Sequence, residues 1–235
     1  MASDTALRNV SATFGVSRSF SGRRWHLRAA DESAVRALAS EHAISTQLAR
    51  VLTAREVANA DIPDLLNPTL KRLLPEPNLL ADMELAVARV TGALEAGEQI
   101  AVFGDYDVDG SCSAALMHDY LAALGAPPRI YIPDRMTEGY GPSPAAMHTL
   151  HGEGASLVIT VDCGATAHAA FEAARDAGLD VIVLDHHATE KLPPALAHVN
   201  PNRAGDHSGL THLCAAGVTF LFLVALNRAL RSGGW

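Results

Sequence analysis

The chain has 235 residues, a formal net charge of −8 at pH 7 and a 49% share of hydrophobic residues. That length allows one large domain or two small ones, and the hydrophobic share is ordinary for a globular protein, which excludes a mainly disordered chain. The acidic balance weighs against a general nucleic-acid binder, and three scattered cysteines indicate reduced thiols in a cytoplasmic protein rather than a disulfide framework.

The N-terminal residues 1–30 lack an apolar periodicity, and we expect them to form a loosely ordered arm. No apolar stretch of a signal peptide is present there. The basic run RSFSGRRWHLR (18–28) allows two interpretations. It is either a solvated, mobile segment, or an arm that contacts phosphates through its arginines and stacks a base on Trp25.

The sequence of residues 31–75 predicts a region of short helices that precedes the main domain. The segment that starts at Asp31, DESAVRALASEHA, begins with an acidic cap and has apolar residues at helical spacing. Thr53 followed by Glu56 has the spacing of a capping box, which predicts a second helix start. Prolines then break the stretch into turns. We expect the main domain to occupy residues 76–235.

The main domain predicts strands that alternate with helices. After a helix at about 82–96, strands are expected at 99–103, 129–133, 156–161 and 180–184, and helices at about 111–124, 144–151, 166–177 and 213–231. Continuous apolar strands that alternate with helices indicate an α/β fold with a parallel sheet flanked by helices on both faces. The apolar stretch 214–226 is too short to cross a bilayer and predicts a buried helix, so no membrane association is expected.

Three aspartates follow the first predicted strand, in the sequence GDYDVDG: Asp105, Asp107 and Asp109. An EF-hand calcium loop has the same spacing of acids. Its twelfth position, however, would require an acidic ligand where this chain has Leu116, and a helix rather than a strand should precede it. The aspartates therefore lie at the end of a strand and need another explanation.

Two further strands end in groups that can bind a metal. Asp162 follows the strand at 156–161, and Asp185, His186 and His187 follow the strand at 180–184. Because ligands bind at the carboxyl ends of parallel strands, we expect all these groups at one edge of the sheet. One aspartate after a strand is commonly a helix cap, but three such strand ends indicate a metal site.

The donor set predicts the kind of metal. Carboxylates with one or two imidazoles suit Mn²⁺ or Mg²⁺ better than a structural zinc. Cys163 lies near these groups, but a lone cysteine is more often a small packing residue. This many carboxylates predicts two ions about 3.5–4 Å apart, an arrangement suited to hydrolysis of phosphoesters or phosphoanhydrides.

The motifs GDYDVDG, VDCGAT, LDHHATE and VNPN, in this order, resemble those of the DHH phosphoesterase superfamily. With the loop YIPDRMTEGYGPS (131–143), they are more closely similar to the RecJ group, the bacterial single-strand-specific 5′→3′ DNA exonucleases. The resemblance covers roughly residues 75–235. It implies a DHH phosphoesterase-like fold and a metal-dependent exodeoxyribonuclease, a hydrolase of DNA repair and recombination.

The resemblance also implies a ligand set. Asp105 and Asp107 would bind the two metals, Asp162 would bridge them, and His186 would be a further ligand. Asp109 stays open between a direct role at the metals and a supporting role in the loop.

Other residues would act on the DNA. By the same resemblance, His187 would contact the scissile phosphate, and Asp185 would orient the imidazoles. Arg135 and Tyr140 would engage the DNA strand near its 5′ end, a guanidinium for phosphate and a ring for stacking or a hydroxyl for hydrogen bonding. The alternatives are that Arg135 pairs with Glu138 and that Tyr140 wedges the loop.

The family's fourth motif carries another metal-binding aspartate, and this chain ends at RSGGW, before such a motif. We therefore expect a domain truncated before the fourth motif, an inactive or weakly active piece of the enzyme. The expected partners are single-stranded DNA and, with it, a repair helicase or a single-strand-binding protein. The rival interpretations are a DHH phosphoesterase acting on short oligonucleotides or cyclic dinucleotides, and a non-catalytic nucleic-acid-binding scaffold.

Overall fold

The computed structural model describes residues 12–235, and the chain divides into two compact units, Met1–Leu74 and Pro75–Trp235. The predicted arm at 1–30 falls partly on residues 1–11, which lie outside the described residues. The first unit contains short helices: η2 (Thr13–Gly15), α1 (Glu32–Glu41), α2 (Thr46–Ala54), η3 (Asn59–Asp61), α3 (Ile62–Leu66) and α4 (Leu70–Leu73).

Side-chain caps begin the two longer helices of the first unit. The Asp31 carboxylate accepts the backbone N–H of Ser33 at 2.7 Å and begins α1, and the Ser45 hydroxyl accepts that of Leu48 at 3.2 Å and begins α2. The prediction of a capping box and a second helix start at Thr53 is wrong. Thr53 lies in the last turn of α2, where its hydroxyl donates to the carbonyl of Ala49 at 2.9 Å and cannot cap a following helix.

The second unit is built on a parallel sheet. Its strands are β1 (Ile100–Gly104), β2 (Arg129–Tyr131), β3 (Leu157–Val161), β4 (Asp180–Leu184) and β5 (Ala197–Val199). Its helices are η4 (Pro77–Leu79), α5 (Met83–Ala96), α6 (Val108–Ala123), α7 (Pro144–Gly152), α8 (His168–Asp176) and α9 (Ala215–Ser232). The strand order is β2-β1-β3-β4-β5, and every neighbouring pair is parallel.

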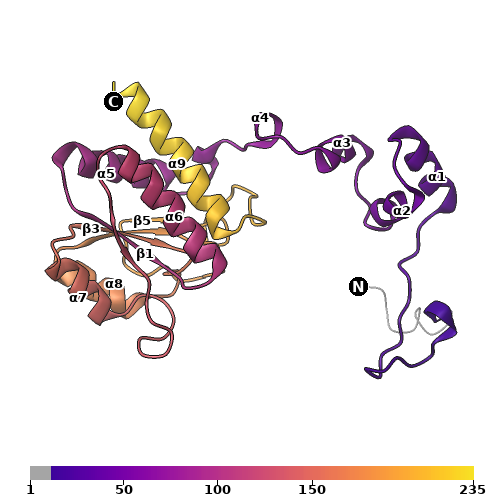
Figure 1. Ribbon diagram of the computed structural model, residues 1–235, viewed down its shortest axis with the longest axis horizontal. Coiled ribbons are helices and arrows are strands. Elements are labelled where there is room, and N and C mark those ends of the chain that lie inside the picture. Colours follow the sequence, from indigo (N-terminus) through magenta and orange to yellow (C-terminus); the bar gives the residue numbers. More distant parts are fainter. Residues whose placement is uncertain (1–11) are drawn as a thin grey trace. The chain divides into compact units, whose positions relative to one another are not determined.

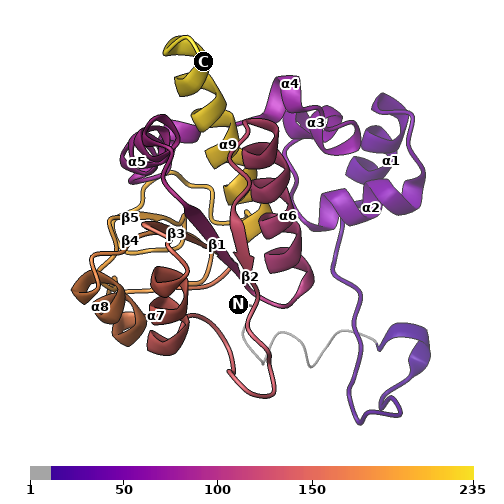
Figure 2. The ribbon, with the colours of Figure 1, turned by 60° about the vertical axis from the view of Figure 1, so that its left-hand side comes forward.

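Helices cover both faces of this sheet. Figures 1 and 2 show α7 and α8 on one face and α5, α6 and α9 on the other. Alternate strand residues, among them Phe103, Val158 and Val183, form a buried cluster with Met147 of α7 and Phe171 of α8. The predicted α/β class, with a parallel sheet flanked by helices and preceded by a helical region, is confirmed.

Helix α9 is the most apolar long helix of the described residues. By length and composition alone it could cross a membrane, but half of it is buried within the unit, where it packs against α5 and α6. Core helices of globular proteins have the same length and composition. Val218, Phe222 and Leu226 of α9 are fully buried, as expected for a helix that covers a sheet.

Several element boundaries differ from the predicted ones for local reasons. Helix α6 begins at Val108, not 111, because the Asp107 carboxylate accepts the backbone N–H of Gly110 at 3.0 Å and acts as its N-cap. The segment before VNPN, for which no strand was predicted, pairs with β4 as the edge strand β5. These shifts leave the predicted aspartates and histidines at the carboxyl ends of β1, β3 and β4.

Candidate metal centre

The strand order fixes where the site lies. After β1 the chain crosses to β2 on one side, and β3 lies on the other side of β1. This reversal leaves a crevice outside the carboxyl ends of β1 and β3, which is where open α/β sheets bind ligands. Asp105 and Asp107 follow β1 and Asp162 follows β3, so the three carboxylates lie on both sides of the crevice.

The turn after β1 brings its carboxylates close to the sheet. Asp105 is 4% exposed, and burial raises the pKa of its carboxyl group. The pKa of Asp107 is lowered, mainly because its carboxylate accepts the Gly110 N–H. Gly110 allows the close turn: a Cβ there would lie 2.6 Å from the carbonyl oxygen of Asp105, a contact that backbone atoms cannot relieve.

Asp162 is the most constrained of the acids. Its backbone has φ 61°, a left-handed conformation that a non-glycine residue seldom adopts, and its side chain is 1% exposed. Burial, followed by contact with the Asp107 carboxyl group, raises its pKa to about 8. Its Oδ1 atom is buried and has no hydrogen-bond partner among the described residues.

The carboxylates and imidazoles meet in two overlapping groups. One is Asp105, Asp107 and Asp162, and the other is Asp162, His186 and His187; in each, the potential ligand atoms lie within 4.8 Å of one another. Asp162 belongs to both groups. The structure therefore brings together five of the seven residues that the sequence places at three strand ends.

The loop after β4 is held by the buried Asp185. Its Oδ1 accepts the backbone N–H of His186 at 2.7 Å and Nδ1 of His187 at 2.8 Å, and its Oδ2 accepts the N–H of Ala165 at 3.0 Å. Burial favours the neutral carboxyl, but the hydrogen bonds from His187 and its neighbours outweigh it, and the pKa of Asp185 is lowered. The same bond to Asp185 raises the pKa of His187 to about 8.

His186 faces the acids. Its Nε2 lies 3.3 Å from Oδ1 of Asp162 and 3.7 Å from Oδ2 of Asp109. The approach to Asp162 is close, although it lacks the geometry of a hydrogen bond, so Oδ1 of Asp162 stays unpartnered.

Two asparagines of the VNPN motif fix the histidine backbone. Asn200 donates from Nδ2 to the carbonyl of His187 at 2.9 Å, and Asn202 donates to that of His186 at 2.7 Å. The sequence showed the motif but gave these side chains no role. Pairing of β5 beside β4 places them there.

Asp109 caps the N-terminus of the last helix, α9. Its two carboxylate oxygens accept the backbone N–H groups of Ala215 and Ala216, at 2.7 and 2.9 Å, at the N-terminus of α9. Cys214, the N-cap of α9, makes no side-chain cap, so Asp109 supplies it from α6. This arrangement favours the supporting role among the two that the sequence left open for Asp109.

The loop after β2 carries Arg135 and Tyr140. The alternative pairing of Arg135 with Glu138 is not formed: Glu138 accepts the Tyr131 hydroxyl at 2.5 Å and the backbone N–H of Asp134 at 2.8 Å. Tyr140 is 56% exposed, and its ring lies 6.4 Å from that of His187. Both residues therefore lie beside the acids, one charged and one aromatic.

Cys163 is fully buried, and its thiol contacts the carbonyl oxygens of Val161 and Phe103. Burial raises the pKa of this thiol well above its usual value, which disfavours the thiolate that a metal would need. Its position is that of a packing residue.

The donor set fits a hard divalent cation. Carboxylates of Asp105, Asp107 and Asp162 with the imidazole of His186 are ligands that Mn²⁺ accepts, and Mg²⁺ accepts the oxygens. The buried, unpartnered Oδ1 of Asp162 is the strongest sign, because such an atom costs free energy unless a cation or donor meets it.

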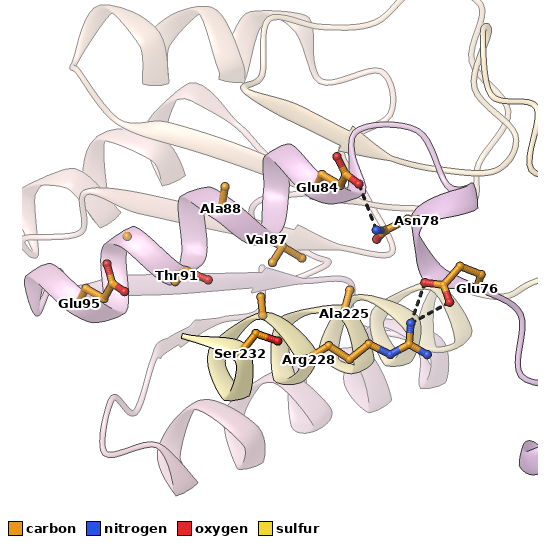
Figure 3. Close-up of a pocket in the computed structure, with 12 residues that line it drawn as sticks. Glu76, Asn78, Glu84, Val87, Ala88, Thr91, Glu95, Ala225, Arg228 and Ser232 are labelled. Atoms are coloured by element: carbon orange, nitrogen blue, oxygen red, sulfur yellow. Dashed lines mark hydrogen bonds and ion pairs between the residues drawn. The ribbon is translucent and has the colours of Figure 1, made fainter. Parts of the chain in front are cut away.

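A separate cavity of about 530 Å³ lies between α5 and α9, away from these residues. Figure 3 shows its lining, in which Arg228 reaches across to Glu76 and Asn78 bonds Glu84. Its acidic rim and small side chains offer nothing for phosphate chemistry. The chemistry of the side chains points to the edge of the sheet and not to this cavity.

The comparisons with known proteins agree with this geometry. Residues 99–232 match the family described as "DHH family, N-terminal domain". The chain belongs to the DHH family.

Within this family the chain is similar to RecJ proteins. It is 35% identical over 204 residues to the single-stranded-DNA-specific exonuclease RecJ of Bacillus subtilis, covering 86% of this chain and 26% of that protein. A crystal structure of exonuclease RecJ bound to manganese aligns with a TM-score of 0.59 and 40% identity, over 64% of this chain and 38% of that one. RecJ of Thermus thermophilus in complex with Mn²⁺ aligns with a TM-score of 0.66 and 31% identity, over 87% and 28%. The chain thus spans well under half the length of these relatives.

Proposed function

We propose that this chain is the metal-binding module of a single-strand-specific 5′→3′ DNA exonuclease of the RecJ type. Such an enzyme hydrolyses phosphodiester bonds during DNA repair and recombination. The observation that carries the proposal is the convergence of Asp105, Asp107 and Asp162 in one group around a buried, unpartnered carboxylate oxygen. The similarity to RecJ proteins over most of the chain supports the choice of substrate.

The cation would be Mn²⁺ or Mg²⁺, held by Asp105, Asp107, Asp162 and His186, with Asp162 shared between two ions. When bound, such ions lower the pKa of a water molecule and stabilise negative charge on the phosphoryl oxygens. The two proposed ligands after β1 differ in burial: Asp105 is buried and Asp107 is exposed. Asp107 therefore faces the side from which a substrate enters.

His187 would hold the scissile phosphate. Asp185 accepts from Nδ1 of His187, which leaves Nε2 as the ring nitrogen free to donate. With a pKa of about 8, the imidazole is mainly protonated at neutral pH and attracts an anion. Asp185 does not touch the substrate in this scheme; it fixes the ring and the backbone of both histidines.

Arg135 and Tyr140 would bind the strand near its 5′ end. Arg135 would donate to a phosphate, and the exposed ring of Tyr140 would stack on a base or bond through its hydroxyl. The DNA is then held on the β2 side of the carboxylates, with its terminal phosphodiester over the acids. Asp109 would support the site without contacting the DNA, because its hydrogen bonds hold the N-terminus of α9 against α6.

A DHH phosphoesterase acting on short oligonucleotides or cyclic dinucleotides is the second candidate, because it needs the same metal site. The identity to RecJ proteins favours the exonuclease. We expect single-stranded DNA as the partner, with a repair helicase or a single-strand-binding protein acting alongside. The cytoplasm suits such a protein, and its three cysteines are free among the described residues.

The test compares substrates on the proposed exonuclease, with the 235-residue chain assayed alone beside it. Long single strands and duplexes, each labelled at the 5′ end, are incubated with Mn²⁺, and the products are sized. We expect labelled nucleotides to be released from single strands only, and the 235-residue chain alone to turn over little or nothing. Cleavage of dinucleotides but not of long strands would favour the second candidate, and strand binding without cleavage would favour a non-catalytic scaffold.

A further inference from the structure

Tyr106 lies between two of the candidate ligands, and the function proposed above gives it no role. It follows Asp105 and precedes Asp107 in the turn after β1, and its side chain is half-buried. Its ring and the ring of Tyr140 make a T-shaped contact, with centroids 6.4 Å apart and planes at 78°. Its hydroxyl makes no hydrogen bond among the described residues. The side-chain contacts of Tyr106 are therefore made by its aromatic ring.

The face of the Tyr106 ring carries Arg135. The guanidinium carbon of Arg135 lies 5.2 Å from the ring centroid, which is the distance of a cation–π contact. None of the ion pairs between described residues involves Arg135, although Asp134 and Glu138 are near it in sequence. Both acids are engaged: Asp134 accepts the backbone N–H groups of Met136 and Thr137, and Glu138 accepts the Tyr131 hydroxyl.

The surroundings make this placement informative. Asp105 is close enough to Arg135 for the positive charge to lower the pKa of its carboxyl group, although burial has the larger, opposite effect. A flexible guanidinium near so many carboxylates would be drawn onto them. An arginine paired in that way would occupy a metal ligand and would have fewer donors left for a phosphate.

We propose that Tyr106 is a positioning residue, whose ring holds the Arg135 guanidinium away from the carboxylates and ready to bind a phosphate of the DNA strand. The inference rests on the proposed function for the identity of the strand, but the contact itself does not. Tyr106 acts through Arg135 and is not assigned a contact with metal or DNA. Tyr140 makes a T-shaped contact with the same ring.

The first arm of the test needs no DNA. Side-chain NMR signals of Arg135, assigned by their absence in Arg135→Ala, should show the upfield ring-current shift of a group over an aromatic face. The shift should persist in Tyr106→Phe and vanish in Tyr106→Leu. The proposal would be overturned, whatever the substrate is, if the Arg135 side chain had its ordinary chemical shift in the unchanged protein. It would also be overturned if Tyr106→Leu left that chemical shift unchanged.

The second arm measures binding of a 5′-phosphorylated single strand with phosphorothioate linkages, in Mn²⁺, for the four combinations of Tyr106→Leu and Arg135→Ala. We expect Tyr106→Leu to weaken binding by about two- to fivefold when Arg135 is present and by nothing when it is absent. Tyr106→Phe should bind as the unchanged protein does, and Mn²⁺ affinity should stay the same in all variants.

The outcomes separate the two proposals. An equal loss from Tyr106→Leu with and without Arg135 would show a direct contact and would overturn the positioning role, as would a loss in Tyr106→Phe. If the unchanged protein binds no strand, the proposed function fails while the NMR arm still decides the role of Tyr106. A collapse of Mn²⁺ affinity in Tyr106→Leu would show that the ring shapes the metal site rather than Arg135.

Discussion

At the scale of single residues, Asp162 combines three unfavourable features, of which a bound cation would relieve the unmatched oxygen. It is buried, its backbone has a positive φ, and one oxygen has no partner among the described residues. Strain and unmatched polarity persist where the surrounding structure imposes them, and they gather at functional sites. Asp162 is also the residue that the two potential ligand groups share, which makes it the residue to test first.

Replacing Asp162 by Asn should separate metal binding from folding. The amide keeps the size of the side chain but cannot carry the charge that a cation needs, so we expect Mn²⁺ affinity to fall at least about 100-fold. Stability of the metal-free protein at pH 8 should not fall, because the variant removes a buried charge. Calorimetric Mn²⁺ titration and thermal unfolding check both, and unchanged affinity would exclude a role for Asp162 as shared ligand.

The pKa of Asp162 predicts how pH acts on the metal-free protein. The folded state holds this proton up to about pH 8, whereas the unfolded chain releases it near the ordinary aspartate pKa of 3.8. Between these pH values the folded state binds more protons, so the contribution of Asp162 to stability decreases as pH rises. Denaturant unfolding at several pH values should show this contribution as the difference between the unchanged protein and Asp162→Asn, because other shifted groups such as His187 add slopes of their own. The same proton competes with Mn²⁺, so affinity should rise with pH up to about 8.

At the scale of elements, the loops of the site are held by contacts that are distant in sequence. Asp109 of α6 caps α9, and Asn202 beyond β5 fixes the backbone of His186 after β4. Each of these bonds joins the end of one element to the end of another. The site is therefore positioned by secondary-structure ends and their caps, which are more rigid than free loops.

Asp109→Ala should loosen α9. The substitution leaves the N–H groups of Ala215 and Ala216 without their acceptors, and loss of a helix cap costs about 0.5–2 kcal/mol. We expect the free energy of unfolding to fall by that amount, and hydrogen exchange of the first turn of α9 to speed up. The matched control is Asp119→Ala, because Asp119 is an exposed aspartate on α6, the helix that also carries Asp109. A stable variant that has lost Mn²⁺ binding would instead favour Asp109 as a direct ligand.

Gly110→Ala should disturb the turn after β1. The added Cβ would lie within 2.7 Å of three atoms of Asp105, two of them backbone, so the turn must move. Overpacking of this kind costs about 1–3 kcal/mol, and we expect weaker Mn²⁺ binding because Asp105 shifts. Gly92→Ala lies inside α5, where the new Cβ meets nothing within 4 Å outside the helix backbone. It should leave metal binding unchanged and raise the free energy of unfolding by up to about 1 kcal/mol, because alanine favours a helix over glycine. Equal behaviour of the two variants would contradict the close approach.

At the scale of the whole molecule, the candidate site belongs to one unit. All of the proposed ligands and DNA contacts lie between Asp105 and His187, within Pro75–Trp235. The core of that unit is built from its own strands and helices. The first unit has short helices and few buried side chains, among them Val35, Leu52 and Ile62.

A protein consisting of residues 75–235 should therefore fold and bind Mn²⁺ as the 235-residue chain does. Circular dichroism and calorimetry check the two statements. The matched comparison is residues 1–74, which we expect to unfold at a lower temperature because a small core buries less apolar surface. Loss of Mn²⁺ binding on removal of residues 1–74 would show that the first unit supports the site.

The sequence predicts most of the fold because apolar strands and helices in alternation have few arrangements available. It also predicts the position of the acids, since parallel strands end at one edge. The failures are local. Thr53 has the pattern of a cap, but its hydroxyl bonds the helix that contains it; β5 is three residues long and is a strand only because β4 lies beside it.

What the sequence by itself determined is which side chains could bind a cation and at which edge of the sheet they gather, because both follow from residue type and from the ends of strands. The tertiary structure alone decided the partners: Asp109 with α9, the asparagines with the histidine backbone, and the Tyr106 ring with Arg135. Such contacts join residues up to 107 positions apart, and their geometry depends on how helices pack on the sheet, which local sequence patterns do not encode.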